Sequence, residues 1–168
     1  FSKKNKIIDC TFDINHSLKK RIEQIREECE IAVREGSSCL ILSDKKISSS
    51  KASIPTILAV GAVHSHLVKM GLRGYCSINV ESSDALDTHT FAVLIGVGAT
   101  TINPYLAIDS IYQRFEKKLF GKLEFENCVL RFKKSIDSGL LKIMSKMGIS
   151  VISSYRGGCN FEAVGLSR

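Results

Sequence analysis

The chain has 168 residues, of which 44% are hydrophobic and 24% are charged, a balance typical of a globular protein rather than a disordered one. This length suffices for one substantial hydrophobic core, whereas no apolar run reaches the ~18 residues that a membrane-spanning helix needs. The net charge of +7 indicates a lysine-rich solvated surface, because no RNA- or DNA-binding motif accompanies the basic residues.

The amino-terminal part predicts a short strand followed by an amphipathic helix. Residues 1–16 are polar, and we expect them to be irregular apart from a strand at Lys6–Ile8. Apolar side chains recur at helical spacing over 18–33, with charged side chains between them, which predicts a helix that buries one face. Gly36 follows and can end this helix.

A short strand and a largely buried helix come next. Cys39–Leu42 is a continuous apolar run, which predicts a buried strand. The serine-rich stretch Lys45–Ser53 predicts a loop. Pro55 then opens a helix that reaches Met70, and apolar residues on nearly every face of this helix predict extensive burial.

The centre of the chain predicts two successive strand–helix units with short connections. Alternating apolar and polar residues predict a strand over 75–80. The Ser-Ser-Asp sequence at 82–84 can cap a helix over 84–96. A short buried strand over 99–102 follows, and Asn103-Pro104 can cap and open the next helix.

The remaining sequence predicts three helices and a last strand. The helices are expected over 105–120, 128–136 and 140–146, with Asp137-Ser138-Gly139 as a break between the second and the third. The apolar residues of Ile149–Ile152 predict a fourth buried strand.

These elements predict an α/β fold built from parallel βα units. Strands near 39–42, 76–80, 99–102 and 149–152 should lie parallel in one sheet, because helices separate them along the chain. A complete eight-stranded barrel needs ~250 residues. We therefore expect a partial (β/α) barrel-like domain, with residues 1–168 as a single domain.

Three polar residues come directly after predicted parallel strands. Asp44, Glu81 and Asn103 should lie at the carboxyl edge of the sheet, where α/β folds place reactive groups. One interpretation is that they form caps and loop hydrogen bonds, with Asn103 capping a helix. The other is that they line a substrate pocket or an internal passage.

Two further features allow more than one interpretation. Arg156-Gly157-Gly158 could hold an anion on backbone donors, or it could be a loop between domains. His64 and His66 lie two residues apart on a predicted helix and should face different ways, which favours packed or surface histidines over a metal site.

The cysteines offer no ligand set for a metal. No two of them have the C-x-x-C spacing of a zinc ribbon or a ferredoxin-like cluster. We expect them to be reduced, buried and metal-free, since cysteine in an apolar strand behaves as a small hydrophobe. They are Cys10, Cys29, Cys39, Cys76, Cys128 and Cys159.

Several sequence blocks over 38–168 resemble one known family. They include Leu40-Ile41-Leu42-Ser43-Asp44, Leu58-Ala59-Val60-Gly61-Ala62-Val63-His64, Ile102-Asn103-Pro104-Tyr105-Leu106-Ala107, Met144-Ser145-Lys146-Met147-Gly148 and Ser154-Tyr155-Arg156-Gly157. These blocks are similar, in the same order, to blocks of the central domain of the large glutamate synthase chain. Lys45, Ser65 and Gly158-Cys159-Asn160 depart from that family's pattern.

The resemblance implies that the chain is a piece of a glutamate synthase, which converts 2-oxoglutarate and glutamine into two glutamates with electrons from reduced nicotinamide or ferredoxin. It implies FMN and an iron–sulfur cluster in the parent protein and no cofactor in this piece. The implied partners are the glutaminase and FMN-binding domains of the same parent chain, between which ammonia passes. We assign no catalytic, cofactor-binding or metal-binding residue here, and we expect the piece to be inactive by itself.

Two other interpretations remain open at this point. One is a free-standing α/β module that binds a phosphorylated ligand at its strand edges. The other is a basic RNA-binding domain, whose affinity would fall steeply with salt. We expect no nucleic-acid or membrane partner and an intracellular location, in the cytoplasm or in a plastid. The electron donor and the oligomeric state are left open.

Overall fold

The computed structural model describes residues 4–158, 160–162 and 164–165, which form a mixed α/β fold. The strands are β1 (Lys4–Asp9), β2 (Thr11–Asp13), β3 (Ser37–Ser43), β4 (Lys51–Ser53), β5 (Ser77–Glu81) and β6 (Thr101–Asn103). Four of them make a parallel sheet in the order β1-β3-β5-β6, and β2 pairs with β4 in the antiparallel sense. The predicted fold of parallel βα units is confirmed.

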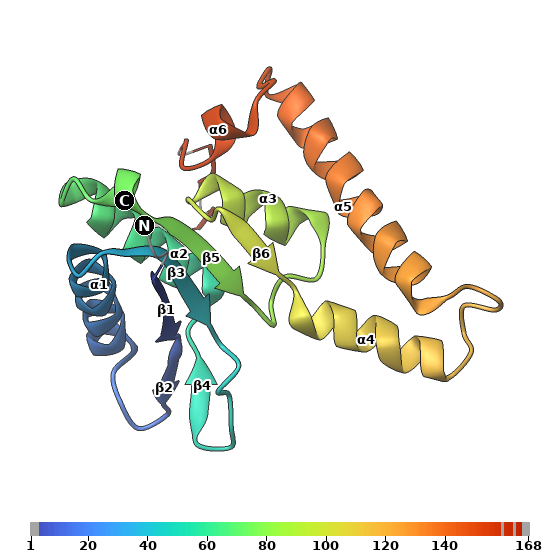
Figure 1. Ribbon diagram of the computed structural model, residues 1–168, viewed down its shortest axis with the longest axis horizontal. Helices are drawn as coiled ribbons and strands as arrows, with labels where there is room; N and C mark the ends of the chain where they lie inside the picture. The colour runs from blue at the N-terminus through green and yellow to red at the C-terminus, as the bar shows by residue number, and fades with distance from the viewer. Residues whose placement is uncertain (1–3, 159, 163, 166–168) are drawn as a thin grey trace.

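The helices occupy one side of the sheet and an arm beyond it. They are α1 (Leu18–Arg34), α2 (Thr56–Lys69), the 3₁₀ helix η1 (Arg73–Tyr75), α3 (Thr88–Gly96), α4 (Tyr105–Glu116), α5 (Phe125–Lys146) and α6 (Ile152–Tyr155). Figure 1 shows α4 and α5 extending away from β6 and returning to α6. None of the described helices is both long and apolar enough to cross a membrane.

One face of the parallel sheet is packed and the other is open. Successive side chains of a strand point to opposite faces, so the register places Ile8, Leu42 and Val80 in one row on the packed face. All three are buried. The neighbouring row on the other face begins with Ile7, which is 64% exposed, and continues to Ile41 on β3.

The core lies between the packed face and helices α1, α2 and α3. Cys29 of α1, Val63 of α2 and Leu94 of α3 are fully buried against the sheet residues. Full burial of one large apolar side chain contributes roughly 1.5–3 kcal/mol, so this layer supplies most of the stabilisation. A second cluster joins Ala92 of α3, Met144 of α5 and Tyr155 of α6.

Three of the predicted strands are found in the sheet and the fourth is another segment. β3, β5 and β6 correspond to the strands expected near 39–42, 76–80 and 99–102, and they are parallel. The fourth strand is β1, which pairs with β3 over its whole length and is longer than the expected Lys6–Ile8. Most of the polar amino-terminal stretch therefore belongs to the two sheets.

The prediction of a strand at Ile149–Ile152 is wrong. The amide of Ile149 donates to the Met144 carbonyl (2.9 Å) and that of Gly148 to the Ser145 carbonyl (3.1 Å). With Gly148 at φ +71°, this is the glycine-ended turn that closes many helices, in which the next apolar residue packs back on the helix. Ile149 packs in this way against the second cluster, and Ile152 begins α6.

Several predicted boundaries differ from those in the structure. The loop expected at Lys45–Ser53 contains β4, whose three residues pair with β2. Helix α3 begins at Thr88, because Asp87 rather than 82–84 is its cap and accepts a hydrogen bond from the Thr90 amide (2.8 Å). Helix α4 ends at Glu116 instead of reaching residue 120.

The helix break expected at Asp137-Ser138-Gly139 is also wrong, because α5 runs unbroken through it. Gly139 lies against the start of α3, where an added Cβ would come within 2.4 Å of Cγ2 and 2.7 Å of Oγ1 of Thr88. A glycine costs a helix interior about 1 kcal/mol relative to alanine. At this position its missing side chain allows the two helices to approach closely.

We expect Gly139→Ala to lower the free energy of unfolding by about 1–3 kcal/mol, because the new methyl group overlaps Thr88. Helix propensity alone predicts the opposite sign. Urea unfolding followed by circular dichroism measures the change. Ser138→Ala, an exposed neighbour in α5, is the matched control, and Thr88→Ala in the Gly139→Ala background should restore part of the loss. A stabilised Gly139→Ala variant would contradict the close packing of α3 and α5.

Candidate functional site

Asp44 lies at the centre of a hydrogen-bonded junction at the carboxyl edge of the sheet. Its side chain is only 2% exposed. Oδ2 accepts hydrogen bonds from the amide (2.8 Å) and hydroxyl (2.7 Å) of Ser83, and Oδ1 accepts one from the hydroxyl of Tyr105 (2.8 Å). We call these three residues the Asp44 junction. It connects the end of β3, the β5–α3 loop and the start of α4.

Glu81 lies at the same edge but is partly open to solvent. Its side chain is 24% exposed and accepts hydrogen bonds from Lys45 Nζ (2.9 Å) and from the Ser43 hydroxyl (2.8 Å). The hydrogen bond from Lys45 lowers the pKa of Glu81, and burial of the carboxylate opposes this effect. The Lys45 ammonium also lies 5.4 Å from the centre of the Tyr105 ring.

Asn103 does not cap a helix, contrary to expectation. It is the last residue of β6, and the residue before α4 is Pro104, with no side-chain cap hydrogen bond. The Asn103 carbonyl accepts from the Ser82 amide (3.1 Å), and its side chain adds to the lowering of the Glu81 pKa. The sequence correctly placed Asp44, Glu81 and Asn103 at one edge.

A second hydrogen-bonded group lies beneath the Asp44 junction. The hydroxyls of Thr56 and Ser82, both buried, are 2.8 Å apart. Asp84 accepts from the Thr56 amide (3.3 Å) and donates its own amide to Ser82 Oγ (3.0 Å). These contacts fix the start of α2 to the β5–α3 loop, a role that the sequence did not indicate because the partners are 26 to 28 residues apart.

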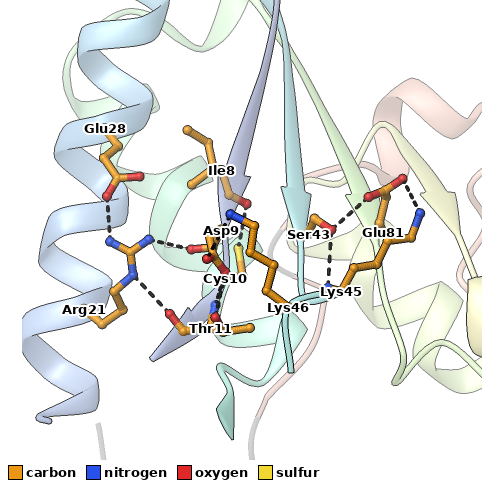
Figure 2. Close-up of polar contacts among 10 residues, drawn as sticks. All are labelled: Ile8, Asp9, Cys10, Thr11, Arg21, Glu28, Ser43, Lys45, Lys46 and Glu81. Carbon is orange, nitrogen blue, oxygen red and sulfur yellow. Dashed lines mark hydrogen bonds and ion pairs between the residues drawn. The ribbon is translucent and has the colours of Figure 1, made fainter. Parts of the chain in front are cut away.

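The end of β1 carries a further polar network, which sequence reasoning missed (Figure 2). Arg21 of α1 donates to the carbonyls of Asp9 (2.6 Å) and Thr11 (3.2 Å) and forms an ion pair with Glu28 (2.6 Å). Burial opposes ionisation of Asp9, yet hydrogen bonds from Thr11 and the charge of Lys46 leave its pKa below the ordinary value. Arg21 thus fastens α1 to the turn between β1 and β2.

Arg156 lies at the opposite edge from the other three candidates. It follows α6, and the amide of the adjacent Gly157 donates to the Ile95 carbonyl at the end of α3 (3.2 Å). The amide of Gly158 donates to the Tyr155 carbonyl (3.2 Å). Because both glycine amides already have acceptors, the loop does not offer the backbone donors expected for a bound anion. This removes the main support for a phosphate site.

The described cysteines are free thiols, and all but the half-buried Cys39 are buried. Burial raises the pKa of Cys10 to about 12 and also raises the pKa of Cys29 and Cys76. A thiolate nucleophile or metal ligand needs the opposite shift. Within the described ranges, no group of three or more His, Cys, Asp or Glu side chains could hold a metal ion. Cys159 lies outside the described residues.

The hydrogen bonds at the carboxyl edge favour a supporting role for its carboxylates over a catalytic one. A general base must come within hydrogen-bond reach of the substrate, whereas Asp44 is buried and its oxygens accept three hydrogen bonds from protein donors. The cap-and-hydrogen-bond interpretation therefore describes Asp44. Tyr105, which the sequence did not single out, completes the junction, and burial together with the Asp44 hydrogen bond raises its pKa to about 12.

Comparison with known proteins identifies similar sequences along the whole chain. Residues 1–167 match the family described as glutamate synthase central domain. The glutamate synthase [NADPH] large chain of Azospirillum brasilense is 55% identical over 164 residues, which cover 96% of this chain and 11% of that protein. The corresponding large chain of Bacillus subtilis (strain 168) is 46% identical over 167 residues, covering 98% and 11%.

A plant protein shows the same relation. The ferredoxin-dependent glutamate synthase, chloroplastic, of Spinacia oleracea is 43% identical over 180 residues, which cover 98% of this chain and 11% of that protein. The chain therefore spans about a tenth of the length of these relatives.

We expect Asp44→Asn to lower the free energy of unfolding by about 2–4 kcal/mol, because the new NH₂ group faces donors and leaves buried hydrogens unpaired. Tyr105→Phe should lower the free energy of unfolding by a smaller amount. The double variant should lose less than the sum of the single losses, since the two residues share a hydrogen bond. Urea unfolding of the four proteins measures this coupling, and strict additivity would contradict it. Tyr112→Phe, on the same helix, is the control.

The lowered pKa of Glu81 predicts a pH-dependent contribution to stability. Ionised Glu81 is favoured in the fold, so its stabilisation is present at neutral pH and is lost as the pH falls through the folded pKa. At pH 7 we expect Glu81→Gln to cost about 0.5–1 kcal/mol, as for a partly exposed ion pair. Unfolding measured at successively lower pH values should show this difference shrink as Glu81 becomes protonated in the folded state. Glu23→Gln, at an exposed position of α1, should show no such trend.

Proposed function

Because the chain belongs to the glutamate synthase central domain family, we propose that it is the connecting domain of a glutamate synthase. In that role it lies between the glutaminase domain and the FMN-binding domain of one long chain. The parent reaction hydrolyses the amide of glutamine and transfers the ammonia to 2-oxoglutarate, with reduction by an electron donor, to give two glutamates. The connecting domain itself performs no chemical step.

The observation that carries this proposal is the family match over residues 1–167, combined with relatives of which the chain covers only 11%. A segment of that share cannot hold all the sites of a two-reaction enzyme. The raised pKa values of the Cys10, Cys29 and Cys76 thiols support the same assignment, since a glutaminase nucleophile needs an activated thiolate.

This domain contributes by holding the surfaces between the two active sites in fixed positions. Ammonia released at one site must reach the other without loss to solvent, so the surfaces between the sites must keep their positions. The Asp44 junction fastens β3, the β5–α3 loop and α4 to one another. The Arg21 network does the same for α1 and the β1–β2 turn. The carboxyl edge of the sheet is accordingly a rigid body rather than a set of loops.

We place the cofactors outside residues 1–168, in another domain of the parent protein. FMN and an iron–sulfur cluster belong to the neighbouring synthase domain, which also accepts electrons from the donor. The names of the relatives specify NADPH for two bacterial proteins and ferredoxin for the plant protein, so the donor differs within the family. The partners of this domain are then the glutaminase and FMN-binding domains of its own chain, in an intracellular enzyme.

The test measures ammonia transfer in the complete protein. Tyr105→Phe removes a hydrogen bond to a charged acceptor, worth about 1.5–3 kcal/mol, and loosens the Asp44 junction. We expect more free ammonia per glutamate formed from glutamine, while glutamate synthesis from added ammonia stays unchanged. Tyr112→Phe is the matched control, because its hydroxyl forms no hydrogen bond to any described residue.

The purified chain provides a second arm of the test. Mixed with FMN and glutamine, it should neither quench flavin fluorescence stoichiometrically nor release ammonia above a blank. Flavin binding or glutamine turnover by the chain alone would overturn the assignment as a connecting domain. Equal ammonia release by the Tyr105→Phe and wild-type proteins would contradict the contribution of the Asp44 junction.

A further inference from the structure

A cationic group at the amino-terminal edge of the sheet carries an inference that rests on the proposed function and extends it. We call it the amino-edge cluster, formed by His64 of α2, Arg73 of η1 and Arg156 after α6. Arg73 donates Nη1 to the Cys76 carbonyl (2.6 Å) and Nη2 to the Gly98 carbonyl (2.9 Å). These acceptors are uncharged, so the hydrogen bonds orient the guanidinium but leave its charge uncompensated.

His64 adds a directed donor to this cluster. Its Nδ1 accepts a hydrogen bond from Arg73 Nε (3.0 Å), so the ring proton lies on Nε2. Burial, and then the charge of Arg73, lower the pKa of His64 and keep the ring neutral at pH 7. The ring lies between two glycines: an added Cβ would come within 2.3 Å of Nδ1 at Gly98 and within 2.8 Å of Nε2 at Gly157.

Arg156 is the member without a partner. Its Nε is buried and has no hydrogen-bond partner among the described residues. Its charge contributes to lowering the pKa of Arg73, after burial, so the two guanidinium groups lie within electrostatic range of each other. A buried donor left unsatisfied costs about 1–3 kcal/mol, and more when it is charged. Two cations within electrostatic range of each other, one of them with an unsatisfied donor, therefore form a group that gains from a negative partner.

The ion pairs of the described residues do not include that partner. No Asp or Glu of the described residues forms an ion pair with Arg73 or Arg156. The remaining positions, 1–3, 159, 163 and 166–168, contain no Asp or Glu. A carboxylate at this cluster must therefore come from another part of the protein.

We propose that the amino-edge cluster is the docking point for an Asp or Glu side chain of another domain of the same protein. A carboxylate fits because it is planar and accepts two hydrogen bonds from a guanidinium in a defined geometry. A free phosphate is disfavoured, because the Gly157 and Gly158 amides that would hold it already donate to carbonyls. Arg156 then acts as a positioning residue that fixes this domain against its neighbour.

The experiment is a zero-length crosslink in the complete protein. Arg156→Lys keeps the positive charge and introduces an amine that a carbodiimide can join directly to a carboxylate in contact with it. Peptide mass spectrometry then identifies the carboxylate. We expect one dominant crosslink from position 156 to an Asp or Glu outside this domain in the same chain. Ser153→Lys, an exposed neighbour on α6, is the control for random coupling.

A charge reversal then tests the energetic contribution. Arg156→Glu should lower the unfolding temperature of the complete protein, and changing the crosslinked carboxylate to arginine should restore it. The proposal is overturned if the crosslink joins position 156 to a residue of this domain or to a second molecule. It is also overturned if the yield does not exceed that of Ser153→Lys, or if the reversal gives no rescue.

None of these readouts measures ammonia transfer, so failure of the docking point is distinguishable from failure of the connecting function. A missing crosslink beside a normal Tyr105→Phe effect would reject only the docking point. A crosslink without that effect would leave a docked domain that takes no part in ammonia transfer.

Discussion

The buried carboxylate of Asp44 is the interaction on which the carboxyl edge of this domain depends. It joins its own strand end to two segments that are 39 and 61 residues away in sequence, through hydrogen bonds of 2.7 and 2.8 Å. A buried charge is costly unless its lone pairs are satisfied, so these partners cannot separate without leaving an uncompensated anion. The strand end, the following loop and the next helix must therefore keep one arrangement.

The two edges of the sheet differ in their charge balance. At the carboxyl edge, the carboxylates have donors within the domain, as the pairs of Lys45 with Glu81 and Lys46 with Asp9 show. At the amino edge, two guanidinium groups face uncharged acceptors or none. This distribution of charge fits the connecting role that we propose, in which one edge of the sheet is satisfied within the domain and the other is completed by a neighbouring domain.

Glycine at three positions allows distant segments to pack closely, which residue propensities alone do not predict. Gly139 has the helix propensity of a breaker, yet it lies inside α5 because α3 approaches it too closely for a side chain. Gly98 and Gly157 enclose the His64 ring in the same way. In each case a segment distant in sequence leaves too little space for a side chain, so only glycine fits at the position. The open face of the sheet, with Ile7 exposed, has no such neighbour within the described residues.

The sequence by itself determined the local elements and the family. The apolar run of β3, the alternation of β5 and the amphipathic α1 sufficed for a parallel α/β fold, and the blocks around Asp44 and Arg156 sufficed for the resemblance to glutamate synthase. Both kinds of signal depend on neighbouring residues. The positions of Asp44, Glu81 and Asn103 at one edge followed from the same pattern. Only the tertiary structure decided which strand is fourth, since β1 is largely polar and is specified by its pairing with β3. It also decided that Ile149 closes a helix and that Gly139 does not break one. The role of Tyr105 depends on its hydrogen bond to Asp44, and the position of Arg156 depends on the hydrogen bond from Gly157 to Ile95. Each of these contacts spans more than 60 residues, so no local sequence pattern predicts it.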